Sequence, residues 1–191
     1  MNIEKEIYFG NTDTFAIRYV PGYKSAEGNH YYAICHLVLG GQIIGDKNEF
    51  CYLNSWMYSL QLIKEQIKTD FLSIQHKEFN NRSDKEIFEL IWKANQLEED
   101  YKPEYLSLPK LENKVWSKCQ ISIDETTDAF LITMSADNEK IKFIWEGWRD
   151  PCPKDKLGKL FTVSVNVAFV VETIESCLNK IESEILNYPI K

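Results

Sequence analysis

Histidine and cysteine are the first residue types to consider for a transition-metal site or a reactive thiol in this chain. The three histidines, His30, His36 and His76, are not spaced as a pair of metal ligands. The five cysteines lie far apart, with no Cys-x-x-Cys pair among them: Cys35, Cys51, Cys119, Cys152 and Cys177. We therefore expect no metal site, no cofactor and no disulfide framework.

The sequence also contains no recognisable set of catalytic residues. Cys35 and His36 are adjacent, and neighbouring residues on a strand point to opposite faces, so they do not form a nucleophile–base pair. The phosphate-binding Gly-x-x-x-x-Gly-Lys loop, the Gly-x-Ser-x-Gly elbow and the His-Glu-x-x-His motif are all missing. Asp124, Glu125 and Asp128 offer too few ligands for a hard cation, and we interpret them as a solvated turn. The sequence predicts no catalytic residue.

Candidates for partner binding are more visible than candidates for catalysis. Trp145 continues the alternation of a predicted strand and is expected in the core, whereas Trp148, beside Arg149, falls beyond that alternation. Tryptophan and arginine are over-represented among the residues that dominate binding at protein interfaces. Trp148 is therefore a candidate partner-binding residue.

Two acidic groups are further candidates for contact with a partner. Glu172 and Glu175 lie on the outward face of a predicted C-terminal helix, and a second group is the run Glu98, Glu99 and Asp100. Such runs commonly do no more than solvate a surface. The functional interpretation is that they steer a cationic partner, which raises the association rate more than the affinity.

The first half of the chain is predicted to form a β-hairpin followed by two helices. Period-2 alternation predicts a strand over 14–20, ended by Pro21-Gly22 and followed by a loop over 23–29. Strands over 31–39 and 42–44 are joined by Gly40-Gly41, and residues 50–53 continue along the edge. A helix capped by Asn54 or Ser55 runs to about residue 69, and the Ser83–Glu86 capping box begins a second helix.

The second half is predicted to form a β-meander and a long closing helix. Strands are expected over 117–124, 129–136 and 140–148, then a proline-containing loop over 149–159, a last strand over 160–167 and a helix from about residue 168. The predicted fold is α+β: a mostly antiparallel sheet, made of the hairpin and the meander, packed against two central helices and the long C-terminal helix. Local patterns leave open whether the strands form one sheet or two.

Composition limits the classes of partner and compartment. The chain has 191 residues, 44% of them hydrophobic, which is typical of one globular domain, so residues 1–191 are treated as a single domain. The net charge of −7 disfavours nucleic acid and anionic membranes as partners. No apolar run is long enough to span a membrane, and the unpaired cysteines indicate a reducing, cytoplasmic location.

Three segments of the first half carry a resemblance to a known family. Phe9-Gly10, Phe15-Ala-Ile-Arg-Tyr19 and Leu39-Gly-Gly-Gln-Ile-Ile-Gly-Asp46 resemble the opening of the immunity protein 42 family of bacterial polymorphic-toxin systems, among them toxin–antitoxin systems of contact-dependent inhibition. The later strand ending Val163-Ser-Val-Asn-Val167 and the terminal helix are similar in outline. The resemblance implies a cytoplasmic protein that binds and neutralises a cognate toxin domain stoichiometrically, without catalysis. We expect this protein to be a monomer or weak dimer.

Two alternatives remain open at the level of sequence. One is a small-molecule-binding or hydrolytic enzyme with a site in the groove between sheet and helices, lined by His36, Asp46 and Tyr52. The other is an adaptor that self-associates through an exposed strand edge near residues 50–53.

Overall fold

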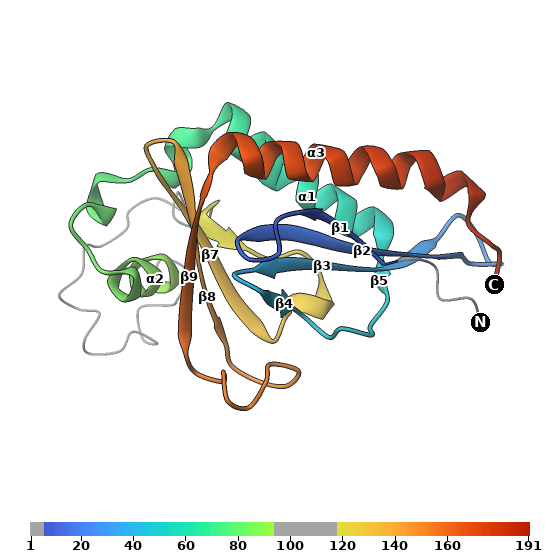
Figure 1. Cartoon of the computed structure of the whole chain (residues 1–191), viewed down its shortest axis with the longest axis horizontal. Helices are drawn as coiled ribbons and strands as arrows, with labels where there is room; N and C mark the ends of the chain where they lie inside the picture. The colour runs from blue at the N-terminus through green and yellow to red at the C-terminus, as the bar shows by residue number, and fades with distance from the viewer. Residues whose placement is uncertain (1–5, 94–117) are drawn as a thin grey trace.

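Two antiparallel sheets, partly covered by helices, make up the computed structural model, which describes residues 6–93 and 118–191 (Figure 1). The first sheet has the order β1 (Ile7–Gly10), β2 (Phe15–Lys24), β3 (Tyr31–Leu39), β4 (Gln42–Ile44), with β5 (Cys51–Tyr52) also paired to β3. The second sheet has the order β6 (Gln120–Ile121), β7 (Phe130–Asp137), β8 (Lys140–Gly147), β9 (Leu160–Asn166). The two predicted β segments therefore form two separate sheets.

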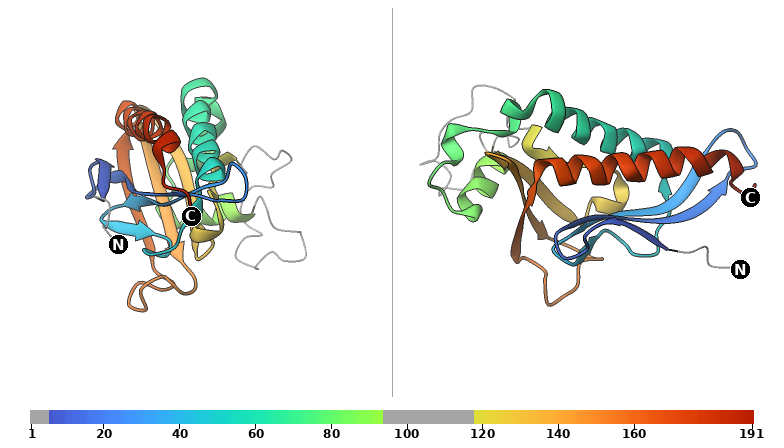
Figure 2. Two further views of the ribbon diagram at one scale, coloured as in Figure 1. Left: turned by 90° about the vertical axis from the view of Figure 1, so that its right-hand side faces the viewer. Right: turned by 45° about the horizontal axis from the view of Figure 1, so that its top comes forward.

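The helices lie on one face of the first sheet and beside the second. The α-helices are α1 (Leu53–Thr69), α2 (Asp84–Lys93) and α3 (Val167–Glu184), and the short 3-10 helices are η1 (Phe71–Ile74), η2 (Lys77–Phe79), η6 (Glu125–Thr127) and η7 (Ile185–Asn187). Helices α1 and α3 run side by side across the first sheet, whereas α2 packs against β8 (Figures 1 and 2). This arrangement confirms the predicted α+β fold.

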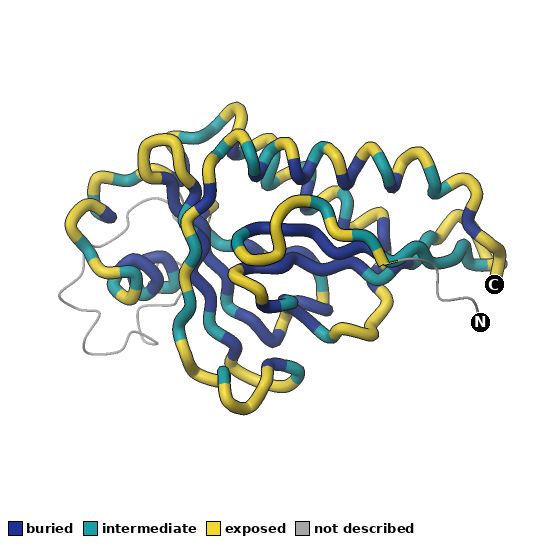
Figure 3. Tube along the Cα trace, viewed as in Figure 1, coloured by how far each residue is buried: buried dark blue, intermediate teal, exposed yellow. Residues whose placement is uncertain are grey.

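The core between the first sheet and its two helices follows the alternation of the strands. Ile17 and Tyr19 of β2 share a face, and the Tyr19 hydroxyl lies 3.2 Å from Glu184 Oε2 of α3, so this face points toward the helices. From α1, Trp56 and Leu60 are fully buried, as their spacing predicted. Dark blue segments in Figure 3 mark the buried strands of both sheets. Amphipathic helices covering an alternating strand face account for the position of this core.

Aromatic side chains join the two sheets. The rings of Phe15 in β2 and Phe143 in β8 stack with their centroids 5.2 Å apart. Trp145 of β8, which is buried as expected, donates its indole N–H to Gln42 Oε1 of β4 at 3.2 Å. The buried side chains of both sheets consequently belong to one hydrophobic cluster.

Strand β2 is longer than predicted, because Pro21-Gly22 does not end it. The register with β3 shifts between Val20 and Tyr23, so that a β-bulge takes up the proline, and pairing resumes as far as Lys24. A Cβ atom at Gly22 would lie 1.8 Å from the Tyr32 carbonyl oxygen, so only glycine permits this close approach. Residues 23 and 24 thus belong to the strand, and the predicted loop over 23–29 is shorter.

The ends of the helices test the capping predictions. Helix α1 begins at Leu53, with Tyr52 at the N-cap and no side-chain cap, so the expectation of a cap at Asn54 or Ser55 is wrong. The capping box of α2 is confirmed: the Ser83 N–H donates to Glu86 Oε2 at 2.8 Å, and the Glu86 N–H donates to Ser83 Oγ at 3.3 Å. Leu53, the first residue of α1, is fully buried.

Other strand boundaries differ where the backbone turns. Strand β1 was not predicted, and it pairs with β2 antiparallel. Strand β6 is shorter than the predicted 117–124, because Asp124 caps the turn η6 through a hydrogen bond from the Thr126 N–H. Strand β9 adds a fourth strand to the meander, and Asn166 then caps α3, accepting from the Ala168 N–H at 2.9 Å.

Candidate partner-binding surfaces

Trp148 lies at the corner that follows β8 and is held there from two sides. Its indole N–H donates to the Asp128 carbonyl oxygen at 2.8 Å, and the Arg149 guanidinium lies 4.4 Å from the ring centroid. The residue is nevertheless 48% exposed. An exposed tryptophan fixed by a hydrogen bond and a cation–π contact presents a rigid apolar surface to solvent.

The acidic side chains of α3 fall into two groups. Glu172 is exposed and makes no ion pair with any residue that the structure describes. Glu175 faces α1, where Lys68 Nζ lies 3.0 Å and Lys64 Nζ lies 3.9 Å from its Oε1. The hydrogen bond from Lys68 lowers the pKa of Glu175. Of the two glutamates Glu172 and Glu175, it is therefore Glu172 whose negative charge is not neutralised by a described neighbour.

Those predicted partner-binding residues that the structure describes do not form one surface. In β8 and β9, Lys140 pairs with Asn166 at the end next to α3, whereas Glu146 pairs with Leu160 at the opposite end, where Trp148 follows. The six residue steps from Lys140 to Glu146, at about 3.3 Å each, separate the two ends by roughly 20 Å. Glu98, Glu99 and Asp100 lie outside the described residues. Trp148 and the acidic face of α3 consequently occupy separate regions, near opposite ends of β8 and β9.

His36, expected in a groove under the enzyme hypothesis, is instead fully buried in a polar network. Arg18 Nη1 donates to His36 Nδ1 at 3.1 Å, and His36 Nε2 lies 2.6 Å from the Asp46 carbonyl oxygen. A guanidinium only donates and a carbonyl only accepts, so the ring is neutral and carries its proton on Nε2. Burial lowers its pKa to about 4. Arg18 also donates to the Lys47 carbonyl oxygen at 2.8 Å and pairs with Glu6.

This network explains Gly45 and Asp46 of the segment that carried the family resemblance. Gly45 has a φ of +116°, and a Cβ atom there would lie 2.7 Å from the Thr126 carbonyl oxygen and 3.1 Å from His36 Cδ2. The turn can therefore lay the Asp46 carbonyl against the histidine only with glycine at position 45. Asp46 takes part through its backbone, so the role is structural.

The expected groove lined by His36, Asp46 and Tyr52 is not formed. His36 is inaccessible, whereas Tyr52 is exposed on the outer surface of the first sheet. Two depressions lie elsewhere. One of about 430 Å³ is lined by residues of α2, the loop before it and β7, among them Arg82 and Ser135, and one of about 560 Å³ lies beside the start of α3.

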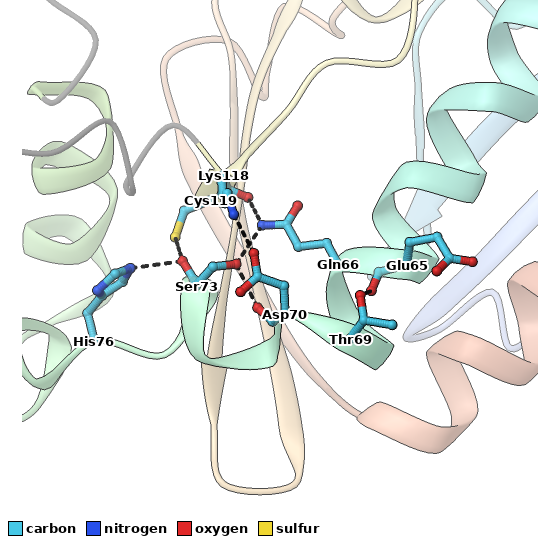
Figure 4. Close-up of polar contacts among 8 residues, drawn as sticks. All are labelled: Glu65, Gln66, Thr69, Asp70, Ser73, His76, Lys118 and Cys119. Carbon is cyan, nitrogen blue, oxygen red and sulfur yellow. Dashed lines mark hydrogen bonds and ion pairs between the residues drawn. The ribbon is translucent and has the colours of Figure 1, made fainter.

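A second polar cluster lies where α1 and η1 meet the start of β6 (Figure 4). The Ser73 carbonyl oxygen accepts a hydrogen bond from His76 Nε2 at 2.9 Å, and Cys119 Sγ lies 3.9 Å from the same oxygen. Gln66 Nε2 donates to the Lys118 carbonyl oxygen at 2.7 Å, and Lys118 Nζ pairs with Asp70. The cluster joins chain segments far apart in sequence and stabilises the junction.

Cys119 and His76 do not form a nucleophile–base pair in this cluster. Both bond to the Ser73 carbonyl oxygen, and burial raises the pKa of the Cys119 thiol to about 12, so the thiol is protonated at neutral pH. Asp124, one of the three carboxylates considered in the sequence as possible cation ligands, accepts a hydrogen bond from Thr126 Oγ1 at 2.6 Å and caps a turn. Among the described residues, no three His, Cys, Asp or Glu side chains are grouped to hold a metal ion.

A group of five aromatic rings on the outer face of the first sheet was missed at the level of sequence. Its members are Tyr23, His30, Tyr32, Phe50 and Tyr52, hereafter the aromatic patch. The available signal was the density of tyrosine around the predicted hairpin, but cross-strand pairing was needed to bring these residues together. Arg18 was also missed, although a charged residue in an otherwise apolar strand pointed to a buried partner.

Comparison with known proteins places the chain in a family. The family model for immunity protein 42 matches residues 5–183. A crystal structure of CdiI from Burkholderia dolosa AUO158 has a similar fold, with a TM-score of 0.60 and 13% sequence identity, and the match covers 91% of this chain and 99% of that chain. No curated protein sequence matches. No helix of the described segments is long and apolar enough to cross a membrane.

The extent of the family match decides the assignment. It spans both sheets and all but the last residue of α3, and it includes each segment in which the resemblance was noted. The chain therefore belongs to the immunity protein 42 family and is a toxin-neutralising immunity protein.

Proposed function

We propose that this protein neutralises its toxin in the cytoplasm by forming a stoichiometric, non-catalytic complex, itself a monomer or weak dimer. The observation that carries the proposal is the family match over residues 5–183. The chemistry of the described residues supports it, because His36 is buried and neutral and the Cys119 thiol is protonated. Five free cysteines, all buried, are compatible with a reducing compartment.

Electrostatic steering by α3 is the second part of the proposal. Glu172 projects an uncompensated charge from the helix, and the whole chain carries a net charge of −7, which favours encounter with a cationic surface. Glu175 contributes less, because Lys64 and Lys68 already neutralise it. Trp148 is proposed as a contact residue outside this acidic face. Glu98, Glu99 and Asp100 are proposed to add to the attraction.

Titration of toxin activity tests the proposal. The toxin domain encoded beside the gene is held well above its dissociation constant, and its activity is measured as the immunity protein is added. Stoichiometric binding predicts a linear fall that ends at one equivalent and does not deepen with time. A catalytic inactivator would instead remove many equivalents of toxin activity at substoichiometric amounts. Absence of complex formation in a pull-down would contradict the proposal outright.

A further inference from the structure

The aromatic patch forms one connected surface. The ring centroids of Tyr23 and Tyr32 are 5.2 Å apart, and Phe50 meets Tyr23 edge-on at 5.5 Å. Tyr52 lies 6.0 Å from Tyr32, and His30 lies 5.6 Å from Tyr52. Three strands and two loops supply these residues, so the patch exists only in the folded protein.

No element of the described segments, residues 6–93 and 118–191, covers the part of the sheet that carries this patch. Tyr23, Tyr32 and Tyr52 pair across β2, β3 and β5, so their side chains share one face. Helices α1 and α3 cover the opposite face, where Tyr19 is buried. On the patch side, Phe50 is 40% exposed and Tyr52 is 38% exposed. The first sheet thus leaves one end of its outer face open to solvent among the described segments.

The backbone also fixes how two tyrosines of the patch meet. The bulge at Gly22 places Tyr23 directly opposite Tyr32, and a side chain at position 22 would collide with the Tyr32 carbonyl. Tyrosine has few rotatable bonds and combines a large apolar ring with a polar hydroxyl, so it loses little entropy on binding. Clustered and exposed aromatic rings are typical of the residues that dominate a protein interface.

Charge around the patch indicates what kind of partner it fits. The chain's own Lys191 places its Nζ 5.0 Å from the centroid of the Tyr23 ring, so a cation already occupies one ring. Glu27, in the loop between β2 and β3, and Glu49, next to Phe50, are exposed and form no ion pair with the described residues. Electron-rich ring faces, with exposed carboxylates on the two loops that supply His30 and Phe50, complement a surface that presents arginine or lysine.

We propose that the aromatic patch is a contact surface for a basic face of the toxin, whose arginine or lysine side chains lie on the tyrosine rings while Glu27 and Glu49 pair with neighbouring cations. This inference rests on the proposed function, because the partner is the toxin of that complex. It assigns the main contact to the first sheet rather than to Trp148.

Binding affinities of matched variants test the inference. The toxin domain is titrated by calorimetry against the full chain and against Phe50→Ala and Glu49→Lys. Phe50→Ala removes a ring of the patch and is expected to raise the dissociation constant at least about tenfold. Tyr58→Ala is the aromatic control, since Tyr58 is 64% exposed on α1 and makes no ring contact with the patch. Asp13→Lys is the charge control, since it makes the same charge change in the turn before β2.

The outcomes separate this inference from the proposed function. Failure of the wild-type chain to bind the toxin would overturn both. Tight wild-type binding that Phe50→Ala and Glu49→Lys leave unchanged would overturn the patch alone. Weakening of both variants, with the two controls at wild-type affinity and circular dichroism unchanged for all four, would support it. A wild-type dimer that dissociates in Phe50→Ala would show that a second copy occupies the patch, which also overturns the inference.

Discussion

Because His36 is buried, the stability of the folded protein depends on pH through this one residue. The folded pKa is about 4, below the ordinary value of 6.5, so the unfolded chain binds more protons between these values. The free energy of unfolding therefore rises as the pH increases across this window. The contribution of His36 is lost as the pH falls through it. We expect His36 to account for about 2 kcal/mol of lost stability between pH 7.5 and pH 5.

Urea unfolding at both pH values checks this expectation. The variant His36→Gln removes the titrating group, and its stability should fall less than that of the wild type on acidification. Carboxylates titrate in both chains and cancel in the comparison. His30→Gln, which replaces an exposed histidine outside this network, serves as the control for the substitution itself. Equal losses in the wild type and His36→Gln would refute the assignment.

At the scale of a single element, two serines at helix starts differ in what they do. Ser83 exchanges hydrogen bonds with Glu86 at the start of α2, whereas Ser55 in the first turn of α1 caps nothing. Ser83→Ala is expected to lower the free energy of unfolding by about 1 kcal/mol, because a backbone N–H of the first turn loses its acceptor. Ser55→Ala should be neutral or slightly stabilising, since alanine favours helix. Thermal unfolding of the two variants measures the difference, and an equal effect at both sites would show that the capping box contributes nothing.

At the scale of the whole molecule, the contact between the two sheets decides whether the chain unfolds as one unit. Phe143 stacks on Phe15 of the other sheet and is buried. Phe143→Ala is expected to cost about 3 to 5 kcal/mol, because it leaves a cavity between the sheets. If residues 1–191 form one domain, tryptophan fluorescence and far-UV circular dichroism should report the same unfolding midpoint in the wild type and in the variant. Separate midpoints would show two independently folding parts.

The electrostatic steering of the toxin toward this protein also depends on the charge distribution of the whole molecule. Glu172→Lys should slow association with the toxin and flatten its dependence on salt, with little effect on the dissociation rate. Changing Glu172 and Glu175 together to Lys should slow it further but also destabilise the protein, because the new lysine at position 175 would face Lys64 and Lys68. Stopped-flow association at several salt concentrations provides the measurement. If Asp13→Lys slows association as much as Glu172→Lys, net charge rather than the helix face is responsible.

The sequence by itself determined the elements that depend on local physics. Alternation located most strands, the stripe of Trp56 and Leu60 located α1, and the Ser83–Glu86 pair located the start of α2. Gly40 and Gly41 specified the hairpin, and both have positive φ in the structure. The family resemblance in the opening segment was likewise carried by residues adjacent in the chain, and the family match confirms it.

Tertiary structure alone decided the features that depend on residues far apart. The bulge at Gly22 is stabilised by pairing with β3, so Pro21-Gly22 read alone indicated a strand end. The burial of His36 depends on Arg18 and on a turn ten residues away, and the aromatic patch needs three paired strands. Register and packing arise from interactions between segments, and a local pattern carries no information about which segments meet.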